Sequence, residues 1–212
     1  MFATNADFIT HVLDYQGIPY EEPFNDVEFN QKVFIPLFKE ALLECQKLID
    51  FSKMRHSENI VLSTGSNAIN LGTNVKYIHS VIDSETGNLL QFGYPYAFES
   101  SQFLHGKPQA YYFSDADGKL YFNKIADKNY EFIVIFYKFD LDSDPHFILQ
   151  EAPELLKTAF IAKLMLYLGR INEWKVFMDQ FYMLAKLQQG MEKQKEYIGT
   201  RFKLDWNYNG WW

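Results

Sequence analysis

Cysteine is scarce in this chain, because Cys45 is the single cysteine among 212 residues. One cysteine excludes an intramolecular disulfide and a metal site built from several cysteines. Cys45 falls on the apolar row of an expected helix, and no histidine lies at helical spacing beside it. We therefore expect a buried structural thiol, with a reactive nucleophile as the alternative.

Positively charged residues are also fewer than negatively charged ones. Lys and Arg total 20 against 27 Asp and Glu, which gives a formal net charge of −7. A protein that grips nucleic acid needs clustered Lys and Arg, so this balance disfavours a nucleic-acid clamp. It would suit a surface that DNA passes without sticking, although most acidic proteins are simply soluble.

Long apolar runs are missing as well. No uninterrupted apolar stretch of about 20 residues occurs, so we expect no membrane-spanning helix. The N-terminal sequence MFATNADFITHVLD lacks a basic flank and a long apolar core, so we expect no signal peptide.

Motifs for catalysis, phosphate binding and metals are lacking. Residues 63–66, Ser-Thr-Gly-Ser, have no Gly-Lys-Ser/Thr, and no serine lies in a nucleophile elbow. Residues 115–118 match the start of a calcium loop, but Lys119 and Ala126 stand where an EF-hand needs ligands, which favours a plain turn. The five histidines show no HxxxH spacing. We expect no enzyme, no metal and no cofactor.

Aromatic residues, by contrast, make up 18% of the chain. Tyr and Trp are enriched at protein interfaces, so this surplus favours a subunit of an assembly. The C-terminal segment is especially rich in them: Phe202, Trp206, Tyr208, Trp211 and Trp212. This tail either folds back onto its own domain or anchors in another subunit, and we favour the anchor.

The middle of the chain is organised by an expected β-hairpin. Two aromatic-rich runs flank residues 115–118, Asp-Ala-Asp-Gly, which favour a type I turn closed by a left-handed glycine. We expect this hairpin to pair Phe113 with Tyr121 and Tyr112 with Phe122.

Further strands are expected on either side of this hairpin. Residues 130–138 alternate between two apolar faces, so we expect a strand that is covered on both sides. Residues 59–62, 75–82 and 89–92 are bounded by turn residues and have strand composition. They either extend the central sheet or form an arm.

Helical patterns occupy both ends of the chain. Thr4 or Asn5 can cap a short first helix. A long second helix is expected from Asp26, with a kink at Pro36 or a break just before it. Its apolar row is Phe34, Leu37, Phe38, Ala41, Leu42, Cys45, Leu48 and Ile49.

The C-terminal part predicts an antiparallel helical hairpin. Pro153 suits the first turn of one helix, and Gly169 suits its end. Asn172 can cap the next helix, and Gly199 is expected to end it.

These elements predict the α+β class, with an antiparallel bundle of about four helices and a small antiparallel β-sheet inserted between the second and third helices. Residues 1–199 are expected to form a single domain, with helical parts at 5–55 and 151–196 and a β insertion at 58–139. Residues 200–212 are the aromatic C-terminal tail.

Three segments carry a resemblance to a known family. They are the helix ending in GIPYEEP, the segment from GYPYAF through FSDADGKLYFNKIAD to IFYKF, and EAPELLKTAFIAKLMLYLGRINEW. Together they resemble the head-to-tail adaptor of short-tailed bacteriophages, also called tail tubular protein A or gatekeeper-like. The likeness covers roughly residues 5–190, and Ala126 stands where the family usually has proline.

The resemblance implies a non-enzymatic virion protein that is assembled in the host cytoplasm. Twelve copies would form a ring between the portal protein and the tail nozzle, with DNA passing through the channel without sequence-specific binding. The tail lies beyond this likeness; its density of aromatic residues, from Phe202 to Trp212, is the separate ground on which we expect it to dock on the portal. Two alternatives stay open: a head-completion or neck protein of a longer-tailed phage, and an aromatic carbohydrate-binding module.

Overall fold

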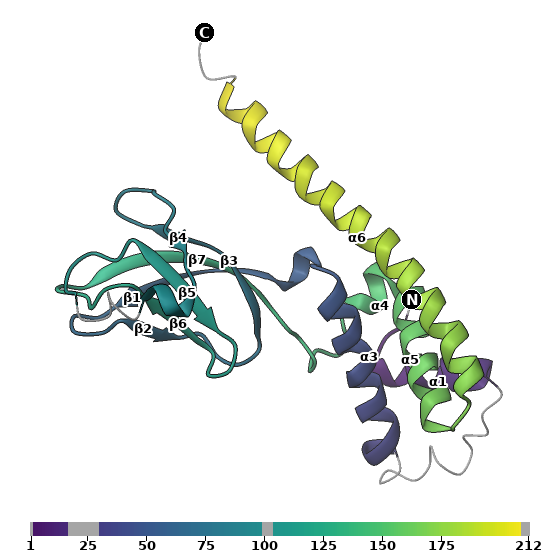
Figure 1. The fold of residues 1–212 in the computed structure, drawn as a ribbon. Helices are drawn as coiled ribbons and strands as arrows, with labels where there is room; N and C mark the ends of the chain where they lie inside the picture. Colours follow the sequence, from purple (N-terminus) through teal and green to yellow (C-terminus); the bar gives the residue numbers. More distant parts are fainter. Residues whose placement is uncertain (1, 17–29, 99–103, 209–212) are drawn as a thin grey trace. The chain divides into compact units, whose positions relative to one another are not determined.

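The computed structural model describes residues 2–16, 30–98 and 104–208, and the chain divides into two compact units (Figure 1). Met1–Ser52 and Leu141–Trp212 form a helical unit, and Lys53–Asp140 form a β unit. The helical unit is therefore built from both ends of the chain, and the β unit from its middle.

The first helices of the helical unit begin where the sequence supplies caps. Helix α1 (Asn5–Tyr15) starts with a capping box, in which the Thr4 and Asp7 side chains each accept the other's backbone N–H. A π-helical turn (Asn30–Phe34) leads into α3 (Ile35–Leu48), with Pro36 in its first turn. No N–H is needed there, and the backbone stays helical through Phe34, so the break predicted just before Pro36 does not occur. The predicted start of this helix at Asp26 lies outside the described residues.

Helices α4 (Ile148–Glu151), α5 (Pro153–Tyr167) and α6 (Ile171–Tyr208) complete this unit. Ala152 separates α4 from α5 with φ −148° and ψ 58°, because a residue that precedes proline disfavours helical backbone. The core contains three rings in mutual contact, with centroids 5.8–6.4 Å apart: Phe8, Phe38 and Phe160.

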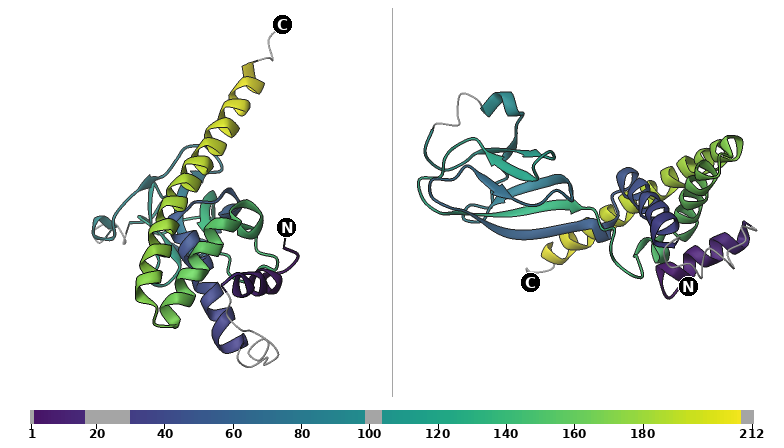
Figure 2. Two further views of the ribbon diagram at one scale, coloured as in Figure 1. Left: turned by 90° about the vertical axis from the view of Figure 1, so that its right-hand side faces the viewer. Right: turned by 90° about the horizontal axis from the view of Figure 1, so that it is seen from below.

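The turn between α5 and α6 is closed by Gly169. Its φ is +72°, and two hydrogen bonds, from Gly169 N–H to the Leu166 carbonyl and from Arg170 N–H to the Met165 carbonyl, form a Schellman motif. The predicted antiparallel helical hairpin is confirmed, since α5 and α6 run side by side in every view (Figures 1 and 2).

Helix α6 continues well past its predicted end. It passes through Gly190 and Gly199 to Tyr208, whereas the sequence predicted an end at Gly199. An interior glycine costs a helix only about 1 kcal/mol relative to alanine, and the good helix formers Gln189 and Met191 flank Gly190. Glycine alone is therefore a weak stop signal.

The β unit holds two sheets, not the single small sheet that the sequence predicted. One sheet has the order β1 (Arg55–Leu62), β7 (Tyr130–Lys138), β3 (Val75–Asp83). The other has the order β2 (Ala68–Asn70), β6 (Lys119–Phe122), β5 (Ala110–Ser114), β4 (Gln91–Phe92).

The two sheets pack against each other across one apolar core. Phe122 of β6 stacks on Phe132 of β7, with ring centroids 5.0 Å apart. The same cluster includes Leu62, Val81, Tyr111, Leu120, Val134 and Phe136. Packing two half-apolar sheets face to face buries both inner faces.

The helix count also corrects the prediction. The described residues contain five α-helices, not a bundle of about four, because the short helix α4 forms just before the helix expected at Pro153. The chain keeps the α+β class, but its architecture is a helical unit plus a two-sheet β unit.

The predicted hairpin exists, but its register differs by one residue. Tyr112 pairs with Tyr121, and Tyr111 pairs with Phe122. The four-residue turn at 115–118 makes Ser114 and Lys119 the last pair, and this fixes every other pair. The expectation that β7 is covered on both sides is wrong in part, since Ile133 and Ile135 on its outer face are only half-buried.

Candidate functional site

A row of exposed aromatic rings lies on the β unit at the end of β4. We call Phe92, Tyr94 and Tyr96 the aromatic row; their side chains are 60%, 58% and 72% exposed. The Tyr94 and Tyr96 rings are parallel within 4°, with centroids 5.8 Å apart, and Phe92 meets Tyr94 edge-on at 5.6 Å. These three rings form an apolar patch that is exposed to solvent.

The backbone beneath the row is fixed by β5. Strand β4 pairs in parallel with β5, and Gly93 N–H donates to the Tyr111 carbonyl. A Cβ at residue 93 would collide with the Phe98 ring, which is buried and packs edge-on against Tyr112 at 5.0 Å. Glycine is therefore needed at residue 93 so that the Phe98 ring can pack against the backbone there.

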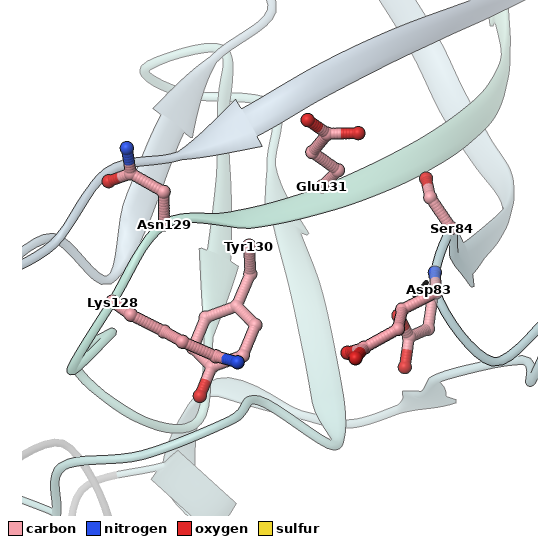
Figure 3. Close-up of a pocket in the computed structure, with 7 residues that line it drawn as sticks. Asp83, Ser84, Lys128, Asn129, Tyr130 and Glu131 are labelled. Atoms are coloured by element: carbon pink, nitrogen blue, oxygen red, sulfur yellow. Dashed lines mark hydrogen bonds between the residues drawn. The ribbon is translucent and has the colours of Figure 1, made fainter.

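A polar pocket of about 280 Å³ opens elsewhere on the β unit, where the turn after β3 meets the start of β7 (Figure 3). Seven residues line it: Asp83, Ser84, Glu85, Lys128, Asn129, Tyr130 and Glu131. The Ser84 N–H donates to the Glu131 carbonyl, which ties the turn to β7.

Asp83 is the most constrained carboxylate of this pocket. It accepts hydrogen bonds from the Thr86 hydroxyl at 2.7 Å and the Glu85 N–H at 3.1 Å, and Lys107 Nζ lies 2.6 Å away. Burial alone would raise the pKa of Asp83, but these bonds and the charge of Lys107 outweigh it and lower the pKa. The same pairing, with Glu85 as second partner, raises the pKa of Lys107.

The opposite wall of the pocket is built around Tyr130. Its hydroxyl donates to Asp127 at 2.7 Å, and this bond is the main reason that the pKa of Tyr130 is raised. Lys128 lies along the ring, with Nζ 5.4 Å from the centroid (Figure 3).

These contacts explain the pocket as part of the architecture. Asp83, Lys107, Asp127 and Tyr130, whose pKa values are shifted, are each paired with another residue of the β unit. The Asp83–Lys107 ion pair joins the turn at 83–88 to the segment before β5, and the Asp127–Tyr130 bond is local to the start of β7. We therefore regard the aromatic row, and not the pocket, as the candidate functional site.

The predicted tail residues are only partly described. Phe202, Trp206 and Tyr208 fall in the last turns of α6, and Trp211 and Trp212 lie outside the described residues. The tail therefore begins as a continuation of a helix and not as a separate segment after Gly199.

Two other sequence candidates have clear structural roles. Cys45 is fully buried, and burial raises the pKa of its thiol, which confirms the interpretation as a structural residue. In the hairpin, Asp117 accepts a hydrogen bond from the Tyr121 hydroxyl at 2.6 Å, which raises the pKa of Tyr121 to about 12. Gly118 has φ +67°, so the predicted turn closed by a left-handed glycine is confirmed.

Sequence reasoning missed the aromatic row as a site. It lies in a stretch with the composition of an irregular aromatic connection, Gly93-Tyr94-Pro95-Tyr96. A signal in the sequence was that Phe92, Tyr94 and Tyr96 are every second residue. In extended backbone this spacing puts successive rings on the same side of the chain.

Within the described residues, no helix is both long and apolar enough to cross a membrane. No protein-family model matches the chain, and a search of curated proteins found no match.

Proposed function

We propose that this chain is a structural, non-enzymatic subunit of a phage head-to-tail connector. Copies of the chain form a ring that bridges the portal protein and the tail nozzle in the virion. In the family that the chain resembles, the ring has twelve copies. The ring forms part of the channel through which DNA leaves, and the chain makes no sequence-specific contact with the DNA.

The observation that carries this proposal is the aromatic row. Three adjacent rings, each more than half exposed, keep apolar surface in water unless a partner covers them. Tyrosine is enriched at the energetic centres of protein interfaces, because its ring is large and rigid and its hydroxyl can stay hydrated. The family resemblance implies that the sheet faces the tail nozzle, and the row lies on the β unit, so we assign the row to the contact with the nozzle.

The experiment that tests the row uses a double variant, Tyr94→Ser with Tyr96→Ser. We expect the wild-type chain to bind purified portal and nozzle proteins, and the variant to keep portal binding but lose nozzle binding by at least about tenfold. Tyr15→Ser is the matched control, since Tyr15 is 67% exposed but lies on the helical unit. Electron micrographs of the mixture also separate a connector ring from a head-completion or neck protein of a longer-tailed phage.

The C-terminal tail is assigned to the portal. The proposal is motivated by the density of aromatic residues there: Phe202, Trp206, Tyr208, Trp211 and Trp212. Deleting residues 200–212 is expected to leave a folded chain that still binds the nozzle but no longer binds the portal. Unchanged portal binding by the truncated chain would remove this assignment.

A carbohydrate-binding module is the second candidate, and the parallel Tyr94 and Tyr96 rings favour it. Two stacked, exposed tyrosines can offer a flat apolar surface to the face of a sugar. A glycan array separates the two functions: binding that disappears in the Tyr94→Ser, Tyr96→Ser variant, without any binding to portal or nozzle, would replace the connector proposal.

A further inference from the structure

Helix α6 carries a second apolar row on the side that faces away from its own unit. Its buried side presents Phe181, Ala185, Gln188 and Glu192, and Glu192 accepts the Ser52 N–H at 3.1 Å. The outward row is Val176, Met183, Leu187 and Met191, which are 49–62% exposed. Steps of seven, four and four residues place these four side chains along one stripe of a straight helix.

Gly190 lies on the same stripe. Glycine is the weakest helix former after proline, yet it occupies an exposed interior position of a 38-residue helix. Apart from its chain neighbours and the backbone of its own helix, no heavy atom of the described residues lies within 4 Å of the place where its Cβ would be. Nothing in the described fold therefore requires a glycine here, whereas the close approach of another helix would.

Two opposite charges border the stripe on one side. Asp179 and Lys186 are both exposed and are two helical turns apart, so they project in nearly the same direction. In a parallel, in-register pair of α6 helices, Asp179 of one copy would lie at the same height as Asp179 of the other, and Lys186 at the same height as Lys186. In an antiparallel pair centred on Met183, Asp179 of each copy lies within one residue of the level of Lys186 of the other, on the same edge of the contact.

We propose that two copies of the free chain pair antiparallel through this face of α6. In the register centred on Met183, Val176 of one copy packs over Gly190 of the other, and the two Asp179–Lys186 pairs form at the edge of the contact. Charge complementarity, the exposed apolar stripe and the glycine all fit this one arrangement.

The pairing goes beyond the proposed function. An antiparallel pair is isologous and closes on itself, so it is a state of the free chain and not the contact that repeats around a ring. The stripe spans about 22 Å of helix, which is short for a permanent interface. The dimer is therefore weak and reversible, and ring assembly can release it.

Sedimentation of the full chain alone tests this inference, over concentrations from about 1 to about 300 µM. We expect a reversible monomer–dimer equilibrium that Leu187→Glu abolishes. Val61→Glu is the matched control: Val61 is 51% exposed and lies on the β unit, so this variant keeps the dimer. Circular dichroism and the melting temperature verify that both variants fold.

Charge exchange then tests the orientation. Asp179→Lys and Lys186→Asp are each expected to raise the dimer dissociation constant about tenfold, because each reversal affects two symmetric pairs. The double variant that carries both changes is expected to restore dimerisation. A wild-type chain that stays monomeric throughout, or a double variant as weak as the single ones, would overturn the inference. Neither result depends on portal or nozzle binding.

Discussion

The ammonium group of Lys107 lies 2.6 Å from the buried carboxylate of Asp83 and 2.9 Å from that of Glu85. Lys107 follows β4 in the chain, whereas Asp83 ends β3, so this ion pair joins two segments that the sequence keeps apart. Glu85 is largely exposed and contributes little, while Asp83 is shielded from water. Most of the effect of the cluster on folding therefore comes from Asp83.

Replacing Asp83 with alanine is expected to lower the free energy of unfolding by about 2–3 kcal/mol, because buried hydrogen bonds to the Thr86 hydroxyl and the Glu85 N–H are lost. Urea unfolding of the variant measures this loss. Glu85→Gln is the control, and it is expected to unfold as the wild type does.

The same carboxylate gives a defined pH dependence. The pKa of Asp83 is lower in the folded chain than its ordinary value, so its ionisation stabilises the fold at pH values above that ordinary value. The contribution is lost as the pH falls below about 4 and passes through the folded pKa. The stability difference between wild type and Asp83→Asn should shrink over that range; a difference independent of pH would contradict the assignment.

Gly118 gives a prediction about the hairpin. Its φ is +67°, and an added Cβ would lie 2.5 Å from the backbone carbon of Gly72, which is not a flexible side-chain end. Gly118→Ala is expected to destabilise the β unit by about 2–4 kcal/mol, through both backbone strain and collision. Thermal unfolding followed by near-ultraviolet circular dichroism measures it.

Gly65→Ala is the control for Gly118. Gly65 has φ +80° but no atom within 4 Å of its added Cβ, so strain alone applies and the expected cost is about 1 kcal/mol. Equal costs at the two positions would show that the approach of the Gly72 backbone does not matter.

The burial of Cys45 predicts that its thiol is protected from chemical labelling in the folded chain. Its side chain is fully buried, and burial raises the thiol pKa, so the folded chain holds little thiolate and admits no reagent. Labelling by a thiol reagent is expected to proceed at the rate of unfolding and to rise with urea. Fast labelling in the absence of denaturant would show that α3 opens locally without global unfolding.

Local patterns in the sequence were enough to predict α1, α3, α5 and several turns, but not α4 or the length of α6. The apolar row through Phe38 and Cys45, the left-handed Gly169 and the turn ending at Gly118 each depend on neighbouring residues alone. The partition of the strands into two sheets was not predictable in this way. Ile60 pairs with Phe132 across a long separation in sequence, and an apolar strand reveals its face but not its partner.

The candidate site was still harder to predict, because composition does not distinguish a buried aromatic ring from an exposed one. Tyr96 is 72% exposed and Tyr111 is 4% exposed, although both lie in aromatic-rich stretches with β character. The difference arises from the pairing of β4 at the edge of its sheet, where the chain leaves the core directly after Phe92. Only the tertiary fold establishes that edge.

The acidic balance of the chain leads to a last prediction about DNA. In the proposed ring, each copy would add a formal charge of −7 beside the phosphate backbone, and retention of DNA needs the opposite charge. We expect no shift of duplex DNA in a mobility assay at about 150 mM salt, with the chain alone or bound to portal. Tight binding that weakens steeply as salt is raised would reveal a basic cluster facing the DNA and would contradict a channel through which DNA slides freely.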